Sequence, residues 1–211
     1  MRKLVLFLAA IMTIGSAAMA QDEEREGGFK KENLFTGGSV TVSFFNGQTI
    51  LGANPIFGYK LNDYIDAGIA INFVSNTTRD YFTYDDKVKQ TVWGPGVFTR
   101  IYPIPFLFLQ AQVEQNFSSY KYTPAPGSGM TTEKDNTDAT SLLLGGGFAS
   151  GRQKGATSFF YISVLFDVLK DRDSPYVSVS YNPSDPNQSR VDVVPIIRAG
   201  VNIGLFQGRY R

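Results

Sequence analysis

The sequence predicts an all-β protein, an eight-stranded antiparallel up-and-down transmembrane β-barrel. Three features lead to this fold class: strands with one apolar face, a secretory signal ahead of them, and connections that alternate in length. The clearest strand spans residues 156–170, where every second residue is apolar: Phe160, Ile162, Val164, Phe166 and Val168. One apolar face opposite a mixed face is typical of a wall between lipid and an enclosed interior.

The first twenty residues have the three parts of a cleavable signal peptide. Arg2 and Lys3 precede an apolar run over residues 4–14, and small residues end at Ala18-Met19-Ala20. This order predicts export and cleavage before Gln21. Residues 21–34 are mostly charged and lack apolar periodicity, so we expect a flexible periplasmic leader there. Residues 35–211 are assigned to the outer-membrane β-barrel.

Composition excludes several other classes of protein. The chain has no cysteine, so it can form neither a disulfide nor a thiolate metal site. Loss of Arg2 and Lys3 with the signal changes the formal net charge from +1 to −1. A nearly neutral chain without basic clusters gives no electrostatic footprint for nucleic acid, and we expect no such partner.

Alternation and turn residues divide the mature chain into eight predicted strands. Asn46-Gly47, Asn62-Asp63 and Pro103-Ile104-Pro105 mark tight turns. The predicted strands cover residues 35–45, 49–61, 64–74, 90–102, 106–122, 141–150, 156–170 and 191–206.

The connections between these strands alternate between short and long. The turns after the second, fourth and sixth strands are short, whereas polar loops cover residues 75–87, 123–140 and 171–189. Short periplasmic turns and long outer loops are typical of transmembrane barrels, and an even number of strands leaves both termini periplasmic. A secreted lipocalin-like barrel has no reason to segregate its loops in this way.

Four segments resemble the small outer-membrane β-barrel proteins of the Bacteroidota. They are FTGGSVTVSF at 35–44, NPIFGYKLND at 54–63, AGIAINF at 67–73 and AGVNIGLF at 199–206. The resemblance implies the barrel of OmpA-, OmpX- and OmpW-like proteins, with the first strand paired to the eighth, in the bacterial outer membrane. These glycine-and-aromatic patterns carry no catalytic chemistry.

The chain also has no histidine. Outer-membrane enzymes of comparable shape, such as lipid A deacylases, palmitoyl transferases and omptin-like proteases, resemble one another in using a histidine as general acid or base. Without His or Cys the usual activated nucleophiles and transition-metal ligands are missing. We therefore predict no enzyme, no catalytic residue, no metal site and no cofactor.

Alternation directs three acidic and three basic side chains into the barrel: Lys60, Asp66, Arg100, Glu114, Asp167 and Arg198. The interior of an eight-stranded barrel is just wide enough for side chains to fill it. We therefore predict a salt-bridged structural plug. A gated pore or a pocket for a small ligand is the alternative.

An aromatic and acidic loop tip supplies the contact candidates Tyr81, Phe82 and Tyr84. Exposed aromatic side chains of this kind can contact a protein partner or a glycan. The alternative is that they simply extend the hairpin above the membrane.

The predicted function is non-enzymatic: a structural or interaction role that presents extracellular loops, with outer-membrane lipid and lipopolysaccharide as partners. One alternative is an accessory subunit of a larger outer-membrane transport, secretion or assembly complex, which small outward residues such as Gly52, Ala53 and Ala67 would favour. Another is a carrier or narrow conduit for a small hydrophobic molecule. Inward glycines that leave interior space would favour it: Gly58, Gly68, Gly96, Gly146, Gly147 and Gly200.

Overall fold

The computed structural model describes residues 28–45, 48–80, 84–153, 157–182 and 185–206. The chain divides into two units, residues 1–30 and residues 31–211. In the first unit, residues 28–30 are described and contain no helix or strand; the predicted signal peptide lies outside the described residues. The second unit begins with a short 3-10 helix, Lys31–Asn33, directly before the first strand.

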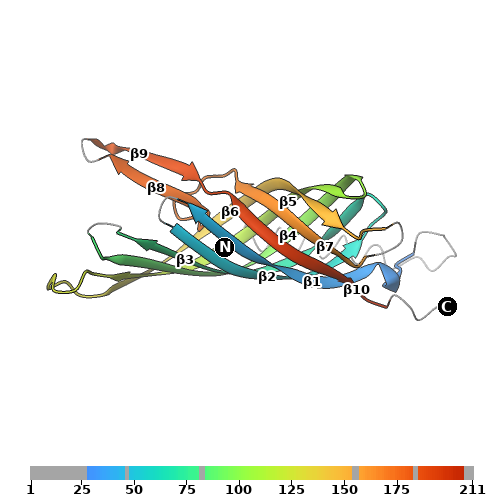
Figure 1. Ribbon diagram of the computed structural model, residues 1–211, viewed down its shortest axis with the longest axis horizontal. Helices are drawn as coiled ribbons and strands as arrows, with labels where there is room; N and C mark the ends of the chain where they lie inside the picture. The colour runs from blue at the N-terminus through green and yellow to red at the C-terminus, as the bar shows by residue number, and fades with distance from the viewer. Residues whose placement is uncertain (1–27, 46–47, 81–83, 154–156, 183–184, 207–211) are drawn as a thin grey trace, which may run out of the picture. The chain divides into compact units, whose positions relative to one another are not determined.

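Eight strands of the second unit form a closed antiparallel barrel in the order β1-β10-β7-β6-β5-β4-β3-β2 (Figure 1). They are β1 (Leu34–Phe45), β2 (Gln48–Lys60), β3 (Ile65–Arg79), β4 (Lys87–Ile104), β5 (Leu107–Thr123), β6 (Glu133–Ser150), β7 (Phe159–Asp167) and β10 (Ile196–Gly204). Val40 of β1 lies opposite Ala199 of β10 on one side and Ala53 of β2 on the other. The predicted eight-stranded barrel, closed between its first and last strands, is confirmed.

The alternation in β7 follows the predicted pattern residue by residue. Its odd-numbered side chains from Phe159 to Asp167 are buried, and its even-numbered side chains from Phe160 to Phe166 are exposed. Successive side chains of a strand point to opposite faces, so the apolar even set lines the outside of the barrel. The strand is shorter than predicted, because the chain leaves the wall after Asp167.

Two predicted loops are in fact paired strands. β6 begins at Glu133, so residues 133–140, expected in a loop, pair with β5 from Tyr122 to Gln115. β3 likewise continues to Arg79, opposite Lys87 of β4. The prediction was wrong here because polar residues occupy both faces, which removes the alternation, while backbone hydrogen bonds still hold the ladder.

The predicted last strand, residues 191–206, is broken at Val194-Pro195. Residues up to Val193 belong to β9 (Asp185–Val193), which pairs with β8 (Val177–Asn182) in a separate two-stranded sheet. Pairing with the barrel starts only at Ile196. Pro195 has no N–H to donate to a ladder, which favours an interruption at this point.

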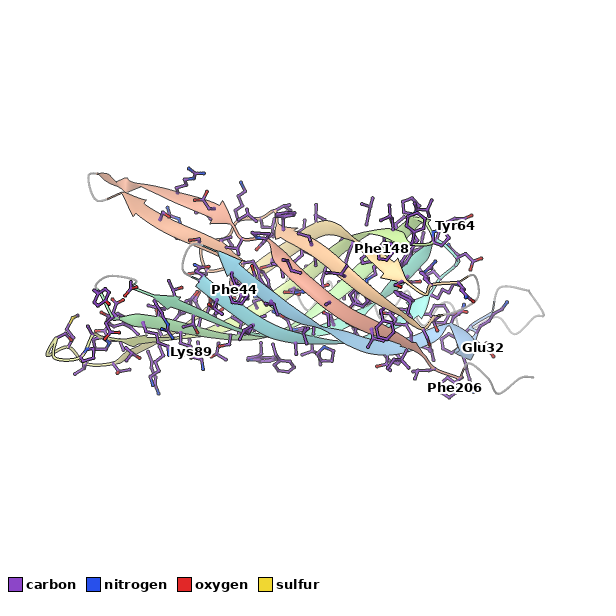
Figure 2. The ribbon with its side chains drawn as sticks, in the orientation of Figure 1. Glu32, Phe44, Tyr64, Lys89, Phe148 and Phe206 are labelled. Carbon is purple, nitrogen blue, oxygen red and sulfur yellow. The ribbon has the colours of Figure 1, made fainter. Side chains whose placement is uncertain are left out.

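The short and long connections lie at opposite ends of the barrel. The turns β2–β3 and β4–β5 share one end with the start of β1 and the end of β10, where Leu205 N donates to Leu34 O at 2.8 Å. The hairpins β3–β4, β5–β6 and β8–β9 continue from the other end (Figure 1). In Figure 2, Tyr64 and Phe148 lie toward the end with the short turns, and Phe44 and Lys89 toward the hairpin end.

The outer face of the barrel is apolar between two aromatic zones. Near the hairpin end, Phe73, Trp93 and Phe117 are direct neighbours on β3, β4 and β5; we call them the aromatic row. The rings of Trp93 and Phe117 lie 5.1 Å apart. At the other end Phe106 and Phe148 lie with their rings 6.1 Å apart.

Aliphatic side chains occupy the outer face between these zones, including Ile69, Ile71, Val97, Leu109 and Val113. Of the small residues predicted to face outward, Ala53 does so, but Gly52 lies opposite the buried Thr41 and faces the interior. Among the described residues, no helix has the length and hydropathy needed to cross a membrane.

Candidate functional site in the barrel lumen

All six charged side chains predicted for the lumen are buried: Lys60, Asp66, Arg100, Glu114, Asp167 and Arg198. They do not form one cluster. Glu114 and Arg198 are the two that meet directly, with Arg198 Nη2 2.9 Å from Glu114 Oε1. Lys60, Asp66 and Arg100 are direct cross-strand neighbours, but their direct contacts, and those of Asp167, are with residues that the sequence analysis did not select.

The Glu114 carboxylate on β5 is the centre of a hydrogen-bonded group. Its Oε1 accepts from Arg198 Nη2 and, at 2.7 Å, from Gln112 Nε2. Its Oε2 accepts from the Tyr176 hydroxyl at 2.8 Å. Both oxygens of this fully buried carboxylate are therefore satisfied, which a buried charge requires if it is to be tolerated.

Tyr176 enters the lumen from the segment between β7 and β8. The side chain is fully buried, and its neighbours from Ser174 to Ser178 are buried too. Its hydroxyl also accepts from Asn72 Nδ2 at 2.7 Å and from Arg198 Nη2 at 3.3 Å. Sequence analysis missed Tyr176 because strand alternation says nothing about a residue that a loop folds back into the barrel.

Polar side chains continue this network around the wall. The path runs through Thr41, Asn54, Asn72, Asn116, Ser141, Ser174 and Asp167, from β1 to β7. Asp167 accepts from Ser174 Oγ at 2.6 Å and from the backbone N–H groups of Leu142 and Leu169. This carboxylate is thus satisfied by neutral donors, where a salt bridge was expected.

Arg100 lies closer to the short-turn end and is surrounded by aromatic rings. Its guanidinium carbon is 4.1 Å from the ring centre of Tyr161, and the rings of Phe98 and Phe108 lie at 5.1 and 5.2 Å. Arg100 Nε donates to Gln110 at 2.9 Å, and Nη1 donates to Asn202 at 3.2 Å. Asp66 of β3 lies directly opposite Arg100, but the direct contacts of this cation are cation–π contacts and amide acceptors.

The space beside several inward glycines is occupied by these rings. A Cβ added at Gly200 would lie 2.6 Å from Tyr161, one at Gly147 would lie 2.5 Å from Phe108, and one at Gly68 would lie 2.9 Å from Phe98. At Gly58 the Phe35 ring fills the same position. These four glycines therefore make room for neighbouring rings, and the interior space expected beside them is filled. Gly146 was predicted to face inward, but it lies between the exposed Leu109 and Val164 and faces outward.

At the short-turn end, Lys60 and Asp66 have partners in turns. Lys60 Nζ is 2.6 Å from Asp63 Oδ1, and Asp66 Oδ1 is 3.8 Å from Arg152 Nη2. Arg152 also lies over the Tyr102 ring, at 3.6 Å from its centre. Arg152 is an additional buried cation that alternation could not reveal, because it follows the end of β6.

The interior side chains hydrogen-bond to one another across the lumen and fill it. Gln110 and Gln112 are hydrogen-bonded at 2.8 Å and link the Arg100 surroundings to the Glu114 group. Among the described residues, no group of three or more His, Cys, Asp or Glu side chains is placed to hold a metal ion. Most of the buried polar atoms named above have a partner within the protein, although Asp66 Oδ1, Arg198 Nε and Asn202 Nδ2 accept or donate no hydrogen bond. The side chains that cross the lumen favour a closed interior.

The loop contact candidates lie away from this network. Tyr84 is 89% exposed at the β3–β4 hairpin tip. Tyr81 and Phe82 lie outside the described residues. A hollow of about 440 Å³ borders the same tip and is lined by Tyr84, Asp86, Thr123 and Pro124 among others.

No protein-family model and no curated protein sequence matches the chain. Solved structures do resemble it. The attachment invasion locus protein Ail of Yersinia pestis, in complex with the heparin analogue sucrose octasulfate, is 9% identical, with a TM-score of 0.45 and coverage of 81% of this chain and 95% of that one. Neisserial surface protein A is 11% identical, with a TM-score of 0.41 and coverage of 82% and 94%.

The N-terminal β-barrel domain of Pseudomonas aeruginosa OprF is 12% identical, with a TM-score of 0.37 and coverage of 82% and 98%. At these identities and TM-scores neither a family nor a function follows from the likeness. The class of this protein, a closed eight-stranded antiparallel barrel, rests on its own strand pairing.

Proposed function

We propose that this chain is a non-enzymatic outer-membrane β-barrel that presents the hairpins β3–β4, β5–β6 and β8–β9 outside the cell. The proposal rests on one observation: charged side chains are buried inside the barrel and apolar side chains are exposed on its outer face, the reverse of a water-soluble protein. Arg100, Glu114 and Arg198 are buried inside, whereas Trp93 is 54% exposed and Phe160 is 70% exposed on the outer face. A water-soluble barrel would bury its apolar side chains, so this wall is suited to lipid.

The length of the apolar wall supports the same proposal. Ile101, near the short-turn end of β4, lies eight positions from Trp93 in the aromatic row. At about 3.4 Å per residue this is about 27 Å along the strand, or about 20 Å along the normal at a tilt of about 40°. Transmembrane strands of about 9–11 residues and aromatic girdles at both interfaces are the expected dimensions.

The filled lumen supports presentation of the hairpins over transport through the barrel. Tyr176, Glu114 and Arg198 cross the lumen, and rings occupy the space beside the inward glycines. A carrier or conduit would need an interior volume that these side chains take up. The projecting hairpins thus become the surfaces for a structural or interaction role, with their tips available to partners.

Trp93 provides a direct test because it is the sole tryptophan of the chain. The purified barrel is reconstituted in vesicles of phosphatidylcholine brominated on the acyl chains, and tryptophan fluorescence is measured. We expect strong quenching relative to unbrominated vesicles, since the aromatic row contacts lipid. Unchanged fluorescence of Trp93 in correctly folded protein would overturn the membrane-spanning proposal.

A matched control moves the tryptophan to the hairpin tip. The variant W93F/Y84W replaces the exposed Tyr84, which lies beyond the apolar wall. Its fluorescence should be quenched by aqueous acrylamide and left unchanged by brominated acyl chains. The comparison separates lipid contact from general quenching.

A further inference from the structure

Three lysines form a cross-strand row on the outer face of the barrel wall where it continues toward the hairpin tips. Lys89 of β4 lies directly opposite Lys121 of β5, and Lys121 lies directly opposite Lys134 of β6. All three side chains are exposed. We call them the lysine row. Figure 2 labels Lys89 on this part of the wall.

Such an arrangement is unfavourable without a counter-charge. Directly opposite side chains have Cβ atoms about 4.5–5.5 Å apart, and like charges at that spacing repel. The ion pairs found among the described residues do not include these lysines. The acid on the same face of β6 is Asp138, two alternating positions away, opposite Phe117, where it accepts from Gln115 Nε2.

The lysine row continues the sequence of layers on the lipid-suited wall. Next to the aromatic row lies a polar set in register, Thr91, Ser119 and Asn136, and the lysine row follows it. Along β4 the order is therefore apolar, aromatic, hydroxyl, then cationic, whereas β6 has Asp138 at the level of the aromatic row and β5 has Gln115 one outward position closer to the apolar wall. The order along β4 is the order of polarity from the hydrocarbon core through the interface to the lipid headgroups.

The distance between the layers fits the headgroup region. Lys89 lies four positions from Trp93 along β4. That is about 13 Å along the strand and about 10 Å along the membrane normal. Long lysine side chains can reach back from there toward a charged layer while their stems cover the wall.

From these observations we infer that the lysine row binds the phosphate of an anionic lipid headgroup at the hairpin-side surface of the membrane. This inference rests on the proposed function, because it needs a bilayer at the aromatic row. The three ammonium groups supply donors and charge for a phosphate that bridges neighbouring strands. The occupant is a lipid, since the row is continuous with the lipid-suited wall and stands above it.

Trp93 tests this inference because it lies on the same strand and face as Lys89. Fluorescence quenching is compared between acyl-brominated phosphatidic acid and acyl-brominated phosphatidylcholine, mixed into unbrominated phosphatidylcholine vesicles. The ratio of quenching constants reports local lipid preference. We expect a preference of at least roughly fivefold for phosphatidic acid, the effect of one lysine near an anionic surface.

The variant carrying Lys89→Gln, Lys121→Gln and Lys134→Gln should reduce this preference to within about twofold of unity. A control carrying Lys31→Gln, Lys170→Gln and Arg190→Gln removes the same charge at exposed positions outside the row. It should keep the wild-type preference. Circular dichroism confirms that both variants are folded.

The outcomes separate the two proposals. Equal quenching by both brominated lipids in the wild type, or a preference that survives loss of the lysine row, overturns the lipid-phosphate site. If the control variant also loses the preference for phosphatidic acid, the preference depends on the overall charge of the protein. That result would also overturn the lipid-phosphate site. Failure of both lipids to quench Trp93 would overturn the membrane-spanning proposal itself.

Discussion

Arg198 and Arg100 are both buried inside the barrel, but their surroundings differ. Arg198 meets a carboxylate, Glu114, and the hydroxyl of Tyr176. Arg100 meets three aromatic rings and two amide oxygens. Arg198 therefore has a carboxylate as its direct partner, whereas the direct contacts of Arg100 are ring faces and amide oxygens. The predicted cluster of acids and bases is two different environments.

The largest expected effect comes from breaking the charge balance around Arg198. Glu114→Gln keeps the shape but leaves the buried guanidinium without its counter-ion. Loss of one partner of a buried pair costs about 3–5 kcal/mol of unfolding free energy. Urea unfolding of the reconstituted barrel, followed by Trp93 fluorescence, measures the change.

A double variant serves as the control for that prediction. Glu114→Gln combined with Arg198→Met removes both charges and should recover most of the lost stability, because no unpaired ion remains. If the double variant is no more stable than the single one, charge balance is not what holds this half of the lumen.

Tyr176→Phe tests the loop contribution to the same environment. The variant keeps the ring in place but removes the donor to Glu114 Oε2 and the acceptor for Asn72. An unsatisfied buried polar group costs about 1–3 kcal/mol, so we expect a loss in that range in the same unfolding assay. Wild-type stability would show that the carboxylate is satisfied without the hydroxyl.

A smaller loss, about 1–2 kcal/mol, is expected for Arg100→Met. The replacement removes the cation–π contacts and the hydrogen bonds to Gln110 and Asn202, and the neighbouring Asp66 keeps its ion pair with Arg152. Methionine also keeps an unbranched side chain against the three rings. If Arg100→Met lowered the unfolding free energy as much as Glu114→Gln does, the surroundings of Arg100 and Arg198 would not differ in the way described.

The smallest effect is expected at the hairpin tip. Tyr84→Ser changes a side chain that is 89% exposed. The unfolding free energy should change by less than about 0.5 kcal/mol, as for most surface substitutions. A larger change would place Tyr84 in a structural contact of the hairpin and remove it from the candidates for partner binding.

Fold prediction succeeded where the evidence is local. Alternation in β7 and the Asn62-Asp63 turn each involve residues that are neighbours in the chain, and both appear where expected. Prediction failed at residues 133–140 and at Val194-Pro195, where pairing depends on the partner strand. A polar strand and a polar loop have the same composition, so only the register distinguishes them.

The sequence by itself determined the fold class, the number of barrel strands and the inward direction of the six predicted charges. These follow from a period of two, which each strand carries alone. Only the tertiary structure decided that Glu114 meets Arg198, that Arg100 lies among rings, and that Tyr176 and Arg152 join the interior. Contacts across a lumen depend on the stagger of the closed barrel and on loops that fold back into it, and neither is encoded in the alternation of one strand.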